Sequence, residues 1–393
     1  MPTKNSEELL NKIKRDVKCF GTRVNKVNNN QFIFLNFSGN YDCNLKAIAE
    51  ELIRQKLDVK LYWAVFPETD LSIFPKEIIP VIRGSRDFYI AMASSKFIID
   101  NEVATAHLGY RKKVDQILIE TWHGSIGIKK FGWYANDDVR WHKLAEKEAK
   151  MTDYVISNSD FENEVYRQTF WDNVPVLKFG HPRNDILFEK DPEKIAKLHE
   201  TICKRYGFSS DKKICLYAPT FRDTDDLSLY KIDYVSIKAS LEKRFGGEWV
   251  ILTKFHNVTK QYLEDFDISK HTIDVSDYPD IQELLLVIDC GITDYSSWIC
   301  EYALRRKAGF IFAPDYKQYT TKERKLFLDL DELPFMVSTN IEELVRNILN
   351  FDELVYTNKC NQFFLTHGSI DDGHASERTV ELLKTIMEAN RGK

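Results

Sequence analysis

Short apolar runs alternate with longer amphipathic stretches along most of this 393-residue sequence. In the first half the apolar runs cover residues 31–37, 59–65, 97–100, 116–120, 154–157 and 174–179. In the second half they cover residues 213–217, 249–253, 272–275, 285–290 and 309–313. Helical patterns lie between them, at 44–55, 139–150, 235–244, 280–286, 298–306 and 341–350. This alternation is typical of parallel β-sheets covered by helices.

The segment Gly180-His181-Pro182-Arg183-Asn184-Asp185 separates the two halves, and its Gly and Pro residues indicate a turn. We therefore predict an α/β protein with two doubly wound, Rossmann-type domains that face a cleft. The first domain would span residues 1–185 and the second residues 186–393, with a C-terminal helix that could return to the first domain.

Composition excludes several classes of function. The net charge of −5 argues against a nucleic-acid-binding protein. The seven cysteines contain no Cys-x-x-Cys pair, so a zinc site or a disulfide framework is not expected, and a reduced, cytoplasmic protein is favoured. No apolar run approaches the roughly 18 residues of a membrane span, which leaves peripheral contact with a membrane. Without a glycine-rich dinucleotide loop or a P-loop, neither nicotinamide cofactors nor ATP are indicated.

Ligands of open α/β sheets bind beyond the carboxyl ends of the strands, so the strand-to-loop junctions are the places to search. The run 117–120 is followed by Thr121-Trp122-His123-Gly124. A neutral imidazole at a strand end could take a proton from an attacking hydroxyl. A loop histidine that satisfies a local hydrogen bond fits the same residues, and by itself the local sequence favours that second interpretation.

Two junctions in the second half carry further candidates. Arg222 follows the run 213–217 and could bind a phosphate through its planar guanidinium, or form a salt bridge to a nearby acid. His256 follows the run 249–253 and could stabilise charge on a leaving phosphate, or cap a strand or helix.

The last junction reads Thr293-Asp294-Tyr295-Ser296-Ser297 and leads into an amphipathic stretch. Hydroxyls and backbone N–H groups at a helix start can bind a diphosphate, although serine is also an ordinary helix cap. Two basic residues, Lys129 and Lys130, follow His123 and could contact acceptor phosphates or a membrane surface.

Taken together, these motifs resemble the CDP-glycerol glycerophosphotransferases, which build wall teichoic acid and related polyol-phosphate polymers. The resemblance runs from about residue 31 to about residue 378. Its matching stretches are Trp122-His123-Gly124, Tyr217-Ala218-Pro219-Thr220-Phe221-Arg222 and Thr293–Ser297, with support from residues 39–44, 180–185, 278–285 and 311–319. The residues after Gly124 look more like the short, primase-type members than the long polymerases.

The resemblance implies a GT-B-like fold, with the acceptor contacted mainly by the first domain and the CDP-linked donor by the second. It implies transfer of glycerol phosphate from CDP-glycerol to a hydroxyl of a lipid-linked saccharide or polyol-phosphate acceptor, with release of CMP, in teichoic-acid or capsule-type synthesis. His123 would be the general base, and His256 and Arg222 would contact the diphosphate. Thr293, Asp294, Ser296 and Ser297 would line the donor pocket, and no metal or other cofactor would be required.

Three alternatives stay open at this point. CDP-ribitol could replace CDP-glycerol as the donor, or a nucleotide sugar could serve a GT-B glycosyltransferase. A catalytically silent binding protein on the same fold is the alternative outside the enzymes. The implied location is the cytoplasm, in peripheral contact with the inner face of the cell membrane.

Overall fold

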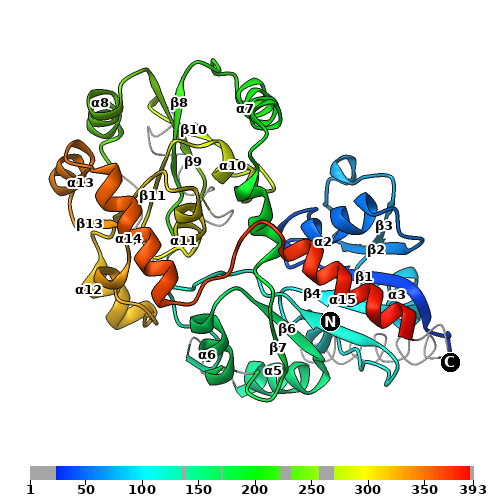
Figure 1. Cartoon of the computed structure of the whole chain (residues 1–393). Helices are drawn as coiled ribbons and strands as arrows, with labels where there is room; N and C mark the ends of the chain where they lie inside the picture. Colours follow the sequence, from blue (N-terminus) through cyan, green and yellow to red (C-terminus); the bar gives the residue numbers. More distant parts are fainter. Residues whose placement is uncertain are drawn as a thin grey trace, which may run out of the picture.

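The computed structural model describes residues 24–134, 139–169, 171–220, 222, 232–255 and 270–389, which form two parallel β-sheets (Figure 1). The first sheet has seven strands in the order β3-β2-β1-β4-β5-β6-β7. Their bounds are β1 Asn28–Leu35, β2 Lys60–Val65, β3 Ile78–Ile82, β4 Ser95–Asp100, β5 Ile117–Glu120, β6 Tyr154–Ser157 and β7 Val176–Lys178.

Successive side chains of each strand point to opposite faces of the first sheet, and helices pack against both faces. On one face, Phe32 and Phe34 of β1 pack with helix α2 (Cys43–Arg54). On the other, Ile33 and Leu35 pack with α3 (Arg86–Ser94). The other α-helices among the described residues of this half are α4 (Ala104–His107), α5 (Val139–Met151) and α6 (Asp160–Gln168).

The second sheet has six strands in the order β10-β9-β8-β11-β12-β13. Its strands are β8 Lys213–Tyr217, β9 Trp249–Thr253, β10 Ile273–Asp274, β11 Cys290–Thr293, β12 Ala308–Phe312 and β13 Met336–Ser338. The helices around it are α7 Pro192–Tyr206, α8 Tyr234–Phe245, α10 Ile281–Val287, α11 Trp298–Tyr302, α12 Tyr316–Gln318, α13 Ile341–Leu349 and α14 Glu353–Thr366.

Strand order reverses in the same way in each sheet. In the first sheet β2 and β3 are added on one side of β1, and β4 is then added on its other side. In the second sheet β9 and β10 are added on one side of β8, and β11 is then added on its other side. This is the doubly wound order of dinucleotide-binding folds, in which ligands bind where the order reverses. The predicted fold class, two Rossmann-type domains in a GT-B-like arrangement, is confirmed.

The chain passes between the two sheets twice. The first passage runs through residues 180–181 and the 3₁₀ segment η3 (Pro182–Phe188), which contains the predicted boundary at residues 185/186. After α14, the chain returns and ends in α15 (Ala375–Ala389), drawn in red beside α2 in Figure 1. Val380, Leu383 and Met387 of α15 belong to the core of the first sheet.

One predicted strand was wrong, and two strands escaped prediction. Residues 285–290 were expected to be a strand, whereas residues 281–287 form α10 and the strand starts at Cys290. A short run of buried apolar residues suits either structure, and the Asp280 side chain caps this helix by accepting from the N–H of Gln282 at 3.0 Å. The unpredicted strands β3 and β13 lie at sheet edges, and β3 contains Pro80.

The C-terminal helix should contribute strongly to stability, because Leu383 is completely buried in the first core. We expect Leu383→Ala to lower the free energy of unfolding by about 2–5 kcal/mol through lost burial and a residual cavity. The matched control is Leu365→Ala on α14, whose side chain is 76% exposed and should change stability by less than about 0.5 kcal/mol. Urea denaturation of both variants measures the difference, and equal effects would contradict this packing.

Candidate active site at the interdomain cleft

Two connected cavities lie between the domains at the carboxyl ends of the strands. The larger has a volume of about 740 Å³, and the smaller one, lined by His123, has a volume of about 200 Å³. Both are lined by side chains of the two halves of the chain, and they share Phe37, Asp42, Pro279, Ile281, Ser296 and Trp298. The cavities are therefore compartments of one cleft, which has room for a nucleotide-linked ligand.

His123 reaches the cleft from a sharp turn after β5. Trp122, the residue before it, has a φ of +52°, which is unfavourable for a bulky side chain and is common where function requires strain. The Trp122 N–H donates to Glu120 at 2.8 Å, and its indole stacks on Phe131. With Trp122 held in the core of its own domain, the next side chain is turned toward the other domain.

The hydrogen bond of His123 fixes its tautomer. Nδ1 lies 2.6 Å from the carbonyl oxygen of Asn101, and because a carbonyl can only accept, Nδ1 must carry the proton. The Nε2 of the neutral ring is then unprotonated. Burial lowers the pKa of His123 to about 4, so the ring is neutral at physiological pH and can accept a proton.

Arg222, a predicted donor contact, lies below the cleft rather than in its lining. Its guanidinium is 2.7 Å from both Asp294 and Asp315 and stacks over Tyr295 and Tyr319. The Asp294 carboxylate also accepts from the N–H of Thr220 at 2.8 Å. These contacts join the loop after β8 to the loop after β11, and they give Arg222 the salt-bridge role that the sequence had left open.

The four residues predicted to line the donor pocket divide into two pairs. Thr293 and Asp294 are buried, and the Thr293 hydroxyl donates to the carbonyl of Ala218 at 2.7 Å. Ser296 lines both cavities and Ser297 lines the smaller one, at the start of α11. The structure therefore brings Ser296 and Ser297 into the same small cavity as His123.

Lys129 and Lys130 are held against the second domain. Lys129 lines the larger cavity, with its Nζ 3.4 Å from the Thr220 hydroxyl, and its strand-like backbone pairs with Leu326. Lys130 lies over the rings of Tyr134 and Phe327. Burial, followed by the charges of Arg324 and Arg222, outweighs the attraction of Asp294 and lowers the pKa of Lys129 to about 8.

Cleft residues that the sequence did not single out are Lys254, Arg324 and Asp42. Lys254 donates to the carbonyls of Ser276 and Tyr278, and burial lowers its pKa. Its position just after β9 was a usable signal. His256, the second predicted catalytic residue, lies outside the described residues. Within the described ranges, no group of three or more His, Cys, Asp or Glu side chains could hold a metal ion.

The two doubly wound domains and the cleft between them define a GT-B-type fold, and the cleft lining contains the cations Lys129, Lys254 and Arg324 together with several carboxylates. The profile of the CDP-glycerol:poly(glycerophosphate) glycerophosphotransferase family matches residues 19–385. The chain belongs to this family.

Curated relatives and solved structures agree with that assignment. A teichoic acid poly(glycerol phosphate) polymerase of Staphylococcus epidermidis is 30% identical over 91% of this chain and 51% of its own length. A teichoic acid glycerol-phosphate transferase of Staphylococcus aureus is 28% identical, over 91% of this chain and 93% of its own. The structure of the wall teichoic acid polymerase TagF superposes with a TM-score of 0.81 at 27% identity, covering 96% of this chain and 94% of that one.

Coverage differs among these relatives. The chain spans about half the length of the S. epidermidis polymerase and of a Bacillus subtilis polymerase, 51% and 52% respectively. A structure of a protein in complex with UDP and glucose has a TM-score of 0.53 at 9% identity, and shows the fold alone.

The Arg222 cluster generates a prediction about stability. Arg222→Gln leaves Asp294 and Asp315 buried beside each other without their cation, which should lower the free energy of unfolding by about 3–5 kcal/mol. Lys307→Gln is the control, because its ion pair with Asp289 is partly exposed and should contribute about 0–1 kcal/mol. Chemical denaturation separates the two, and an unchanged Arg222→Gln protein would show that the guanidinium is not structurally required.

Lys129 generates a prediction about pH. A lysine with a pKa of about 8 loses its charge as the pH rises through 8, so affinity for an anionic ligand in the larger cavity should fall there. Lys129→Arg keeps its charge and should extend tight binding to about pH 9. Titration of CDP-glycerol against both proteins from pH 6.5 to 9.5 measures this. Parallel curves would mean that Lys129 does not contact the anion.

Proposed function

We propose that this protein transfers glycerol phosphate from CDP-glycerol to a hydroxyl of a lipid-linked saccharide or polyol-phosphate acceptor, with release of CMP. The observation that carries the proposal is the fixed tautomer of His123 in a cavity shared with Ser296 and Ser297. Family membership and the likeness to TagF, which has also been solved after a soak with CDPG, support the choice of donor.

In the proposed reaction, Nε2 of His123 takes the proton of the acceptor hydroxyl as its oxygen attacks the β-phosphorus of the donor. The new bond joins this oxygen to phosphorus, and the bond from phosphorus to the bridging oxygen breaks. That oxygen leaves with the electron pair as part of CMP. The proposal also retains His256 as a residue that stabilises the leaving phosphate.

Cationic side chains would neutralise the donor phosphates in the larger cavity. Lys129, Lys254 and Arg324 line it together with Ser296. Arg222 would act through Asp294, by holding the loops after β8 and β11 together, rather than by touching the phosphates. The family resemblance implies that the enzyme needs no metal for this chemistry, so we expect turnover to persist in excess chelator.

A ribitol donor is the principal alternative. A teichoic acid poly(ribitol-phosphate) polymerase of Bacillus spizizenii is 30% identical over 76% of this chain. The donor groups that differ between glycerol and ribitol lie beyond the diphosphate, so the same base and phosphate contacts would serve both. A GT-B glycosyltransferase that uses a nucleotide sugar has support from the fold alone.

A lipid-linked acceptor would bring the enzyme to the inner face of the cell membrane, and we propose peripheral contact there. No described helix is long and apolar enough to cross a bilayer. Helix α5 begins at exposed Val139 and carries exposed Lys143 and Lys147 further along, a combination suited to an anionic interface. Sedimentation with phosphatidylglycerol vesicles, compared for the native protein and a Lys143→Glu/Lys147→Glu variant, tests this contact.

The proposed base can be tested directly. With CDP-glycerol and a lipid-linked disaccharide acceptor, we expect CMP release, and we expect His123→Ala to lower the rate by about 10²–10⁴-fold through loss of proton transfer. His107→Ala is the matched control. Its Nδ1 also donates to a backbone carbonyl, at 2.8 Å from Val103, but the side chain is exposed and outside the cleft.

A parallel assay with CDP-ribitol and UDP-glucose identifies the donor. Faster CMP release from CDP-ribitol would assign the chain to the ribitol branch, and turnover of only the nucleotide sugar would reject the proposal. Binding of CDP-glycerol without any turnover would identify a silent binding protein. Full activity in His123→Ala would remove His123 from the chemistry.

A further inference from the structure

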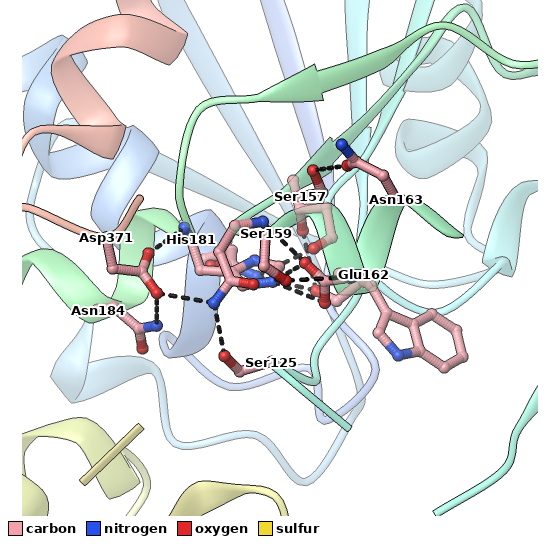
Figure 2. Close-up of polar contacts among 12 residues, drawn as sticks. Ser125, Ser157, Ser159, Glu162, Asn163, His181, Asn184 and Asp371 are labelled. Atoms are coloured by element: carbon pink, nitrogen blue, oxygen red, sulfur yellow. Dashed lines mark hydrogen bonds and ion pairs between the residues drawn. The ribbon is translucent and has the colours of Figure 1, made fainter. Parts of the chain in front are cut away.

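The segment 180–185, where the chain first passes between the domains, is held by the side chains of Asp371, which follows helix α14, and of Glu162 in helix α6. Figure 2 shows Asp371 beside Asn184 and His181: it accepts from the N–H of His181 at 2.8 Å and from the Asn184 amide at 3.0 Å. His181 contacts Glu162 at 2.9 Å. The backbone of this segment is therefore firmly placed, and the intervening side chain, Arg183, projects from a fixed point.

Arg183 bridges the two halves of the active site. One nitrogen, Nη1, donates to the carbonyl oxygen of His123 at 2.7 Å. The other, Nη2, forms a buried ion pair with Glu301 of helix α11. Burial opposes the charge of Arg183, but the Glu301 carboxylate outweighs it and raises the pKa further above its usual range. A permanently charged, planar group thus connects the base turn with the helix that follows Ser296 and Ser297.

Further hydrogen bonds make each end of this bridge rigid. At the first end, the Asn44 amide donates to the carbonyls of Thr121 and Trp122, and its oxygen accepts from the N–H of Arg183 at 3.1 Å. The strained Trp122 backbone is thereby tied to the same segment as Arg183. At the other end, Gln282 donates to Glu301 and, at 2.9 Å, to Asn184.

We propose that Arg183 is a positioning residue that fixes the His123 turn against the donor-side helix α11, so that the base and the Ser296-Ser297 loop stay in register across the cleft. Arg183 would act through the carbonyl of His123 and through Glu301. The inference rests on the proposed function of His123 as the base. It assigns a role to the Gly180–Asp185 motif beyond that of a connection between domains.

Arginine is required here because both arms of a planar fork are used at once. A lysine at position 183 has a single ammonium group and cannot reach the His123 carbonyl and Glu301 with the same geometry. A misplacement of about 1 Å at a reacting group can cost about 10²-fold in rate. We therefore expect Arg183→Lys to lower kcat by about 10–100-fold while the KM for CDP-glycerol changes by less than about twofold.

A double-mutant cycle tests whether Arg183 acts through His123. CMP release is measured for Arg183→Lys in the native and in the His123→Ala background, with enzyme in excess over donor. If Arg183 only positions the base, its effect should shrink to less than about twofold when His123 is absent. An equal loss in both backgrounds would overturn the inference. Arg305→Lys is the matched control, since Arg305 donates to the carbonyl of Leu187 at 2.8 Å and should leave kcat unchanged.

Other outcomes are also decisive. If His123→Ala releases no measurable CMP, the crystal structure of Arg183→Lys decides, because a displaced His123 turn supports the inference and an unmoved turn overturns it. If Arg183→Lys does not fold, Glu301→Gln replaces it in the double-mutant cycle with His123→Ala. If neither variant folds, Arg183 contributes to stability alone and the inference is overturned. Full activity of His123→Ala would instead reject the proposed base, a result that the cycle reports separately.

Discussion

The parallel direction of every strand in the described parts of the chain is the constraint on which the candidate site depends. In each sheet the carboxyl ends of all strands point the same way, and the loops that leave these ends carry side chains that line the cleft. Because the two sets of carboxyl ends face each other, loops after β5, β8, β9 and β11 line one cleft even though their residues are spread along the chain from His123 to Trp298. Two sheets with antiparallel strands would distribute the same loops over opposite edges.

Charged groups in and below this cleft have distinct tasks. Arg222 and Arg183 are buried and form ion pairs with carboxylates of the protein. Their charges are therefore neutralised within the protein, and the ion pairs hold loops in place. Lys129 and Lys254 line the open volume, and burial lowers the pKa of each. A lowered pKa means that burial destabilises the charged form of the lysine. A bound anion would stabilise that charged form, which favours binding of a phosphate-bearing ligand.

The sequence was sufficient to predict the fold class and the strand ends that line the cleft, because apolar runs and chain order determine both. His123, Ser296 and Ser297 were placed at the cleft for that reason. The role of Arg222 was not decided, since an arginine near several acids can contact either them or a ligand, and only distances separate the two. Arg183 stood in a recognised motif, yet its partners lie about 60 and about 120 residues away along the chain. Periodicity carries no information about such contacts.

The two passages of the chain between the domains lie side by side. Asp371 and Asp185 join them by accepting from the N–H groups of His181 and of Ala375 and Ser376, and Arg378 donates to the carbonyl of Phe179. Two covalent connections that lie along one seam constrain the domains more than a single connection would. They resist twisting and sliding of one domain against the other more strongly than rotation about the seam. Any change in the width of the cleft would therefore follow rotation about this one seam.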